Sequence, residues 1–241
     1  MNKLLMLLQR YVPDYQNLIE GVHGWALEEL EEVLGRPLPG FYRTFATFMG
    51  KRAGPLLEHV HGYDPLEVMD FYQLTPASYL PPKRFLYVFG DSSTDAQHYW
   101  LDLEAPSEDE DCQVVRIPLG KEAWKTRLSQ AYVSLQEMLF VWAMRYVGLP
   151  TFEYDAEYLL DMAPPDSEQE VEGLAHVFVK LGFARLSYPR RCMLFERDDA
   201  GIELYRHPSA SGLSFRVGMQ GREEFRRFQA IVEDIKGIKA V

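Results

Sequence analysis

The residues best placed to do chemistry form the turn Gly90-Asp91-Ser92-Ser93, directly after the apolar run Phe85–Phe89. Such a run, bounded by prolines on one side and a glycine on the other, predicts a buried strand. A serine at the carboxyl end of a strand exposes its hydroxyl, and nearby backbone N–H groups can hold an oxyanion. The arrangement would suit a nucleophilic serine, provided that a general base and a group orienting that base lie within reach.

Neither partner of such a serine stands at the expected place in the sequence. Asp95-Ala96-Gln97-His98 has the Asp-x-x-His spacing, but it follows Ser92 too closely to reach around it. His207 follows Glu203, a glutamate instead of an aspartate and one residue too far away. The serine turn is similar to that of GDSL-type esterases, a family that takes both groups from an Asp-x-x-His block near the C-terminus. Because Gly-Asp-Ser-Ser also serves as a plain turn, we predict no catalytic residue and keep Ser92 as the alternative.

The sequence predicts no metal and no cofactor. His59 and His61 would point the same way on a strand and could hold a metal, but no third ligand stands at a recognised spacing. We therefore expect surface histidines. Cys112 and Cys192 lie far apart, which favours free buried thiols in a reducing compartment. Gly-rich phosphate loops and paired Cys-x-x-Cys motifs do not occur in the sequence.

The chain is acidic, with 36 Asp and Glu against 25 Lys and Arg and a formal net charge of −11. An acidic protein repels phosphate backbones, so we expect no direct nucleic-acid binding and a preference for basic partners. The run Ser107–Asp111 predicts a solvated turn. Its carboxylates are the candidate partner-binding surface: Glu108, Asp109, Glu110 and Asp111. Solvation alone explains these residues equally well.

The chain should not enter a membrane. The apolar run near the N-terminus is too short for the core of a signal peptide, and no stretch approaches the ~20 apolar residues of a transmembrane helix. We therefore expect a cytoplasmic protein. The 241 residues, 47% of them hydrophobic, can form one large or two modest domains.

Two short helices joined by a proline elbow are predicted between Trp25 and Gly50. The first shows apolar residues at helical spacing, and Gly35 can end it in the left-handed conformation. Pro37 and Pro39 then interrupt the helix, and a second helix begins near residue 40. The apolar positions of the two helices are Leu27, Leu30, Leu34, Phe41, Phe45 and Phe48. We expect this helical corner to pack on the strand at residues 85–89.

The rest of the chain predicts an α+β protein with two domains, at residues 1–150 and 165–241. Strands at 85–89, 99–103 and 113–117 form a meander, and a long helix at 121–147 lies across it. Residues 162–170 have the composition of a linker. Beyond them, a helical stripe, four strands and a last helix predict a small α-β-β-β-β-α unit.

The helical corner also resembles the opening motif of the SUKH superfamily. The resemblance rests on Glu31-x-x-Leu34-Gly35, Leu38-Pro39, Tyr42, Phe45 and Gly50, and on the block Tyr99-Trp100-Leu101-Asp102. Met49 stands where the family usually has Asn, and the likeness covers residues 25–117 but not the C-terminal third.

The SUKH superfamily includes bacterial immunity proteins against polymorphic toxins and fungal regulators of cell-wall synthesis. The resemblance implies a mixed or antiparallel sheet flanked by helices. It also implies a non-catalytic protein that binds and neutralises a cognate toxin, and the acidic chain favours a basic toxin domain. An intracellular adaptor that organises partners of its own cell is the other role that the family suggests.

Overall fold

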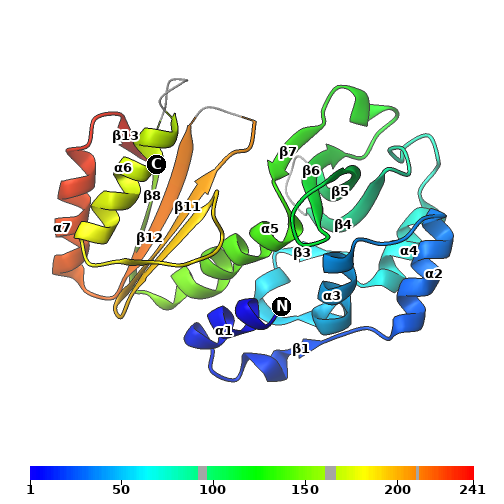
Figure 1. The fold of residues 1–241 in the computed structure, drawn as a ribbon, viewed down its shortest axis with the longest axis horizontal. Helices are drawn as coiled ribbons and strands as arrows, with labels where there is room; N and C mark the ends of the chain where they lie inside the picture. Colours follow the sequence, from blue (N-terminus) through cyan, green and yellow to red (C-terminus); the bar gives the residue numbers. More distant parts are fainter. Residues whose placement is uncertain (92–96, 161–166, 210–211) are drawn as a thin grey trace. The chain divides into compact units, whose positions relative to one another are not determined.

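The computed structural model describes residues 1–91, 97–160, 167–209 and 212–241 and has the α+β architecture that the sequence predicts (Figure 1). Within these ranges the chain forms two compact units. The first unit comprises residues 1–9 and 13–138, and the second comprises residues 10–12 and 139–241. The helices of these ranges include none with the length and apolar character needed to cross a membrane.

The boundary between the units differs from the predicted division into residues 1–150 and 165–241. It falls between residues 138 and 139, ahead of the expected linker. The cause is β8 (Tyr154–Leu160), a strand that the sequence analysis leaves unassigned and that lies inside the sheet of the second unit. Of the predicted linker, residues 162–166 lie outside the described residues, and α6 (Ser167–Lys180) begins directly after them.

A five-stranded antiparallel sheet forms the centre of the first unit, with the strand order β3-β4-β5-β6-β7. Its strands are β3 (Val60–His61), β4 (Phe85–Asp91), β5 (Gln97–Pro106), β6 (Cys112–Pro118) and β7 (Ser129–Tyr132). The strands predicted at residues 85–89, 99–103 and 113–117 are therefore confirmed. A separate short pair joins β1 (Ile19–Glu20) to β2 (Arg52–Ala53).

Several helices belong to the same unit as this sheet. They are α1 (Asn2–Tyr11), which begins in this unit, α2 (Gly24–Leu34), α3 (Gly40–Met49) and α4 (Pro65–Leu74). Gly35 ends α2 as predicted, with a φ of 71° that a side-chain-bearing residue adopts only at a cost. Asp64 caps α4, because its carboxylate accepts the N–H of Leu66 at 2.9 Å.

The helical corner packs on the sheet, as the sequence predicts. Glu31 of α2 accepts the backbone N–H of Leu38 at 2.6 Å and forms an ion pair with Arg43 of α3, so one carboxylate joins both helices to the elbow. Phe45 of α3 contacts Phe89 of β4 edge-on, with ring centroids 5.9 Å apart. The elbow and its helices therefore form part of the core of the first unit.

The helix predicted at residues 121–147 is wrong in its first half. Residues 129–132 form β7, which pairs antiparallel with β6. The helix α5 (Leu135–Trp142) begins only after Ser134, whose hydroxyl oxygen accepts the N–H of Glu137 at 3.0 Å in the manner of an N-cap. The chain then continues as a π-helical turn, Ala143–Gly148.

The second unit is a six-stranded antiparallel sheet with the order β13-β8-β12-β11-β10-β9. Its further elements are β9 (Ala184–Arg185), β10 (Met193–Arg197), β11 (Ala200–Arg206), β12 (Leu213–Met219), α7 (Arg222–Glu233) and β13 (Ile238–Ala240). Residues of α6 and α7 share one buried core with alternate residues of the strands. The predicted α-β-β-β-β-α order is confirmed, and β8 and β13 extend it.

The other face of this second sheet receives the segment between α5 and β8. Gly201 and Gly218 are register partners on β11 and β12, and the Phe152 ring packs directly on both. Beside them, Arg145 of the π-helical turn binds Glu203 of β11 through two hydrogen bonds, of 3.0 and 2.9 Å. Glu203 has no solvent exposure, so this ion pair is part of the packing of the second unit.

Candidate functional site

The first unit carries an apolar groove made of two adjoining hollows of about 530 and 520 Å³. Both hollows are lined by Pro82 and Trp124. The rest of the first hollow comes mainly from α2, α4 and the loop at residues 75–84: Val33, Leu34, Tyr72, Leu80 and Pro81. The second hollow is completed by Phe85, Thr126 and Leu128 among others. Mostly apolar and aromatic linings are typical of binding pockets.

One tyrosine hydroxyl ties the wall of the groove to the sheet. Tyr72 of α4 donates to the carbonyl of Phe85 at 3.3 Å and accepts the N–H of Tyr87 at 2.9 Å. Burial raises the pKa of Tyr72, so the hydroxyl keeps its proton and can play both roles. The groove is therefore anchored to β4 and not only to the loop.

Large apolar side chains remain exposed in and beside the groove. Trp124 is half-buried on a short 3-10 turn at residues 123–125, and Leu128 is 39% exposed. Leu74, at the end of α4, is 82% exposed, and Tyr79 of the following loop is 47% exposed. Both Trp124 and Leu128 fall within the helix predicted at residues 121–147, which would lie across the sheet, so the sequence does not reveal this site.

The charges that line the groove are all positive. Lys83 lines the first hollow, and Arg84 and Lys125 line the second. Arg84 pairs with the buried Asp102 at 2.9 Å and with Glu104 at 3.4 Å, and Lys125 pairs with Glu122 at 2.6 Å on the surface. Among the residues that the structure describes, Lys83 has no carboxylate partner within ion-pair distance. The lining of the groove is thus cationic, although the chain as a whole is acidic, and the carboxylates that pair with Arg84 and Lys125 lie outside the lining.

The predicted acidic turn joins β5 to β6. Glu108, Asp109 and Glu110 are exposed, as expected of a solvated turn. Asp109 and Glu110 have φ values of 59° and 57°, the left-handed pair of a tight hairpin turn, in which glycine or asparagine is usual. The N–H of Phe41 donates to the carbonyl of Glu110 at 3.3 Å, so the turn also contacts the start of α3.

Asp111, the fourth residue of the predicted acidic surface, is not on the surface. It is 1% exposed, and its carboxylate accepts the N–H groups of Cys112 at 2.7 Å and Gln136 at 2.8 Å. Burial raises the pKa of Asp111 to about 6, although these N–H groups oppose the shift. The prediction fails here because a carboxylate within a charged run can still turn inward to hold the backbone together.

The two predicted surface histidines do not form a pair on one strand. His61 lies on β3 and is exposed, whereas His59 precedes the strand and is half-buried. The ring of His61 lies edge-on to that of His98, with centroids 6.4 Å apart. In the described part of the chain, histidines, cysteines and carboxylates do not gather in groups of three that could hold a metal. Cys112 and Cys192 are buried thiols, as predicted.

The alternative nucleophile Ser92 lies outside the described residues, as does the rest of its loop through residue 96. The described groups that flank the loop have other partners. Asp91 binds Arg116 at 2.7 Å, and Nδ1 of the buried His98 accepts the backbone N–H of Asp91 at 3.3 Å. Burial lowers the pKa of His98, with His61 adding to the effect. The hydrolase hypothesis stays a prediction.

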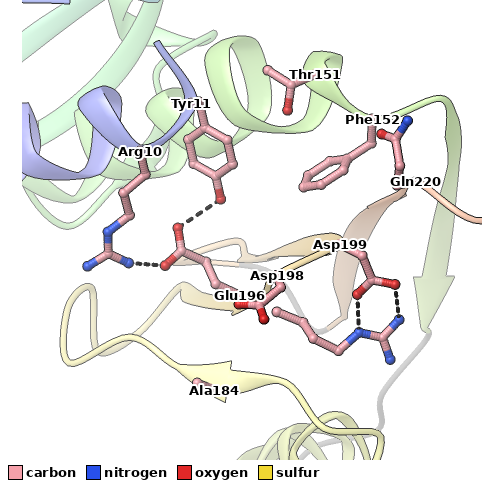
Figure 2. Close-up of a pocket in the computed structure, with 10 residues that line it drawn as sticks. Arg10, Tyr11, Thr151, Phe152, Ala184, Glu196, Asp198, Asp199 and Gln220 are labelled. Atoms are coloured by element: carbon pink, nitrogen blue, oxygen red, sulfur yellow. Dashed lines mark hydrogen bonds and ion pairs between the residues drawn. The ribbon is translucent and has the colours of Figure 1, made fainter. Parts of the chain in front are cut away.

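The second unit has a more polar pocket of about 670 Å³ (Figure 2). On one side, Glu196 accepts a hydrogen bond from the hydroxyl of Tyr11 at 2.8 Å and forms an ion pair with Arg10. On the other side, Asp199 binds Arg197 through two hydrogen bonds. Both carboxylates therefore already have partners within the chain, and a ligand would have to compete with them. The apolar groove of the first unit is the better candidate.

Comparison of the chain with protein-family models and with curated proteins gave no match. The feature that most clearly calls for a partner is the groove, because its apolar side chains are left in contact with water.

Proposed function

We propose that the protein is a non-catalytic binding protein that holds another protein in the groove of the first unit. One observation carries this proposal: the half-buried Trp124 stands between two apolar hollows, with Leu128 and Tyr79 exposed nearby. Aromatic side chains in such positions are the groups that contribute most to binding when a partner covers them.

The SUKH resemblance supports a finer version of this proposal, in which the partner is a cognate toxin and binding neutralises it inside the cell. Glu31, a residue of the SUKH-like motif, joins the two helices and the elbow of the helical corner. This structural role explains its presence in the motif, and the proposal does not require Glu31 to contact the toxin. The exposed acidic turn at residues 108–110 offers a second contact, suited to a basic region of that partner. An adaptor role is the alternative that the same resemblance supports.

The proposal is tested by co-expression with the product of the gene transcribed just before this one. Neutralisation predicts that the protein restores growth and forms a stable complex with that product. Trp124→Ala should abolish both effects. Trp25→Ala is the matched control, because Trp25 lies on α2 of the same unit, is 51% exposed and does not line the groove. Full rescue by the Trp124 variant would exclude the groove as the interface.

The hydrolase alternative has a separate test in the same purified protein. A fluorophosphonate probe reports an activated serine by covalent labelling. Stoichiometric labelling that Ser92→Ala removes would overturn the assignment as a non-catalytic protein. Labelling at the level of the Ser92→Ala background is the expected result.

A further inference from the structure

We infer that the groove binds an acidic segment of the partner, one that carries two apolar side chains, each next to a carboxylate. This inference rests on the proposed function and adds the chemistry of what enters the groove. It differs from the expectation drawn from the whole chain, whose net charge of −11 favours a basic partner. The charge next to the binding surface decides which partner it accepts, because charges farther than about 8 Å are screened at physiological salt.

The charge of the groove comes mainly from Lys83. Its ammonium donates to the carbonyl of Val33 at 3.2 Å, near the C-terminus of α2, where the helix dipole favours a cation. An ammonium has three donors, so further donors remain for a ligand. Among the described residues, no carboxylate lies within ion-pair distance of it. An anionic group of the partner would complete this site.

The second hollow repeats the same combination of an apolar floor and cations. Phe85 is 2% exposed, and the guanidinium of Arg84 lies 4.5 Å from the centre of its ring. Lys125 stands beside Trp124, with its ammonium 5.5 Å from the ring centre. The pair between Lys125 and Glu122 is exposed and therefore weak, so a carboxylate of the partner can replace Glu122 at little cost.

The shape of the groove sets the number of apolar contacts. Pro82 and Trp124 are shared by both hollows, and each hollow has its own cation. A segment crossing Trp124 would therefore place one apolar side chain on each side of the indole ring. A carboxylate next to each apolar side chain would meet Lys83 in the first hollow and Lys125 in the second, because Arg84 already binds Asp102 and Glu104.

The wall of the groove is already rigid before a partner arrives. The loop at residues 75–84 contains Pro76, Pro81 and Pro82, whose rings restrict the backbone. The backbone N–H of Tyr79 closes a turn by donating to the carbonyl of Pro76 at 2.8 Å. Pro81 is buried. A rigid wall lowers the entropy lost on binding, which favours a short segment as ligand.

The experiment uses the full chain and three fluorescein-labelled peptides in fluorescence anisotropy. The first peptide has two leucines flanked by glutamates, the second has lysines in place of the glutamates, and the third has alanines in place of the leucines. The inference predicts that only the first binds well and that added salt weakens its binding. Lys83→Glu should weaken it about tenfold, because an attractive charge becomes a repulsive one. Trp124→Ala should weaken it by at least as much.

Lys3→Glu is the control for the change of charge. Lys3 lies in the exposed first turn of α1 in the same unit, where a glutamate is compatible with the helix dipole, and it does not line the groove. This variant should bind the acidic peptide as well as the unchanged protein does. Equal losses in the Lys3 and Lys83 variants would mean that only the net charge matters, which would overturn the inference.

Two other results would also overturn the inference that the groove binds an acidic segment. Tighter binding of the lysine peptide would show that the groove takes basic segments, and the proposed binding function would then stand with the opposite chemistry. Binding of a dansylated fatty acid without binding of the acidic peptide would make the ligand an anionic lipid. The co-expression test is independent of the peptides, so failure of the peptide chemistry can be told from failure of the proposed function.

Discussion

Two buried carboxylates, Asp111 of the first unit and Glu203 of the second, are held in different ways. In the second unit, Glu203 lies against the guanidinium of Arg145, so its charge is matched by an opposite one. In the first unit, Asp111 is held by backbone N–H groups of Cys112 and Gln136, and no cation among the described residues pairs with it. The burial of Glu203 therefore depends on the side chain of Arg145, whereas the stability that comes from burying Asp111 depends on pH.

The largest expected effect comes from removing the charge of Glu203, the ion-pair partner of Arg145. Glu203→Gln would leave Arg145 charged and largely buried, and we expect the free energy of unfolding to fall by about 3–5 kcal/mol. Glu157→Gln is the matched control on the same sheet, because Glu157 pairs with the half-exposed Arg216 at 2.8 Å. That variant should lose less than about 1 kcal/mol in urea unfolding. Equal losses would remove the distinction between buried and exposed pairs.

Asp111 should make stability depend on pH. Its pKa is raised from 3.8 to about 6 on folding, so the folded protein holds this proton more tightly than the unfolded chain does. The free energy of unfolding should therefore fall as the pH rises from about 4 to about 6, by up to about 3 kcal/mol from this group. Asp111→Asn cannot titrate. The free energy of unfolding, measured across this pH window, should fall more steeply with pH in the unchanged protein than in Asp111→Asn. The same pH dependence in both proteins would contradict the assignment.

The smallest effect concerns the exposed carboxylate of the same run. Glu110 has a φ of 57°, which costs an L residue about 1 kcal/mol relative to glycine. Glu110→Gly should therefore be more stable than Glu110→Ala by about that amount, since both lose the carboxylate and only glycine relieves the backbone. Thermal unfolding of the two variants measures the difference. No difference would mean that the turn relaxes when its side chain is removed.

Local features of the sequence predict much of the fold. Gly35 and Pro39 mark the end of one helix and the start of the next, and the apolar run at residues 85–89 identifies a buried strand, because these signals act within a few residues. The helix predicted at residues 121–147 fails because apolar residues three or four apart also occur where a strand follows a turn. The pattern Ser134-x-x-Glu137 was the signal that could have located the true helix start.

The candidate site was harder to predict than the fold. Trp124 and Pro82 are far apart in the sequence, and only the pairing of β4, β5, β6 and β7 brings their segments to one groove. The inward turn of Asp111 likewise depends on the N–H of Gln136, which belongs to a different element. Contacts of this kind arise from tertiary structure, and no local pattern of residues encodes them.

The hydroxyl of Tyr72 has a consequence for how molecules of this protein meet one another. By occupying the carbonyl of Phe85 and the N–H of Tyr87, it closes a length of β4 that would otherwise be open to a strand from a neighbouring chain. Tyr72→Phe would keep the ring and free those two groups. Self-association, visible as concentration-dependent light scattering, should then precede any loss of the folded state.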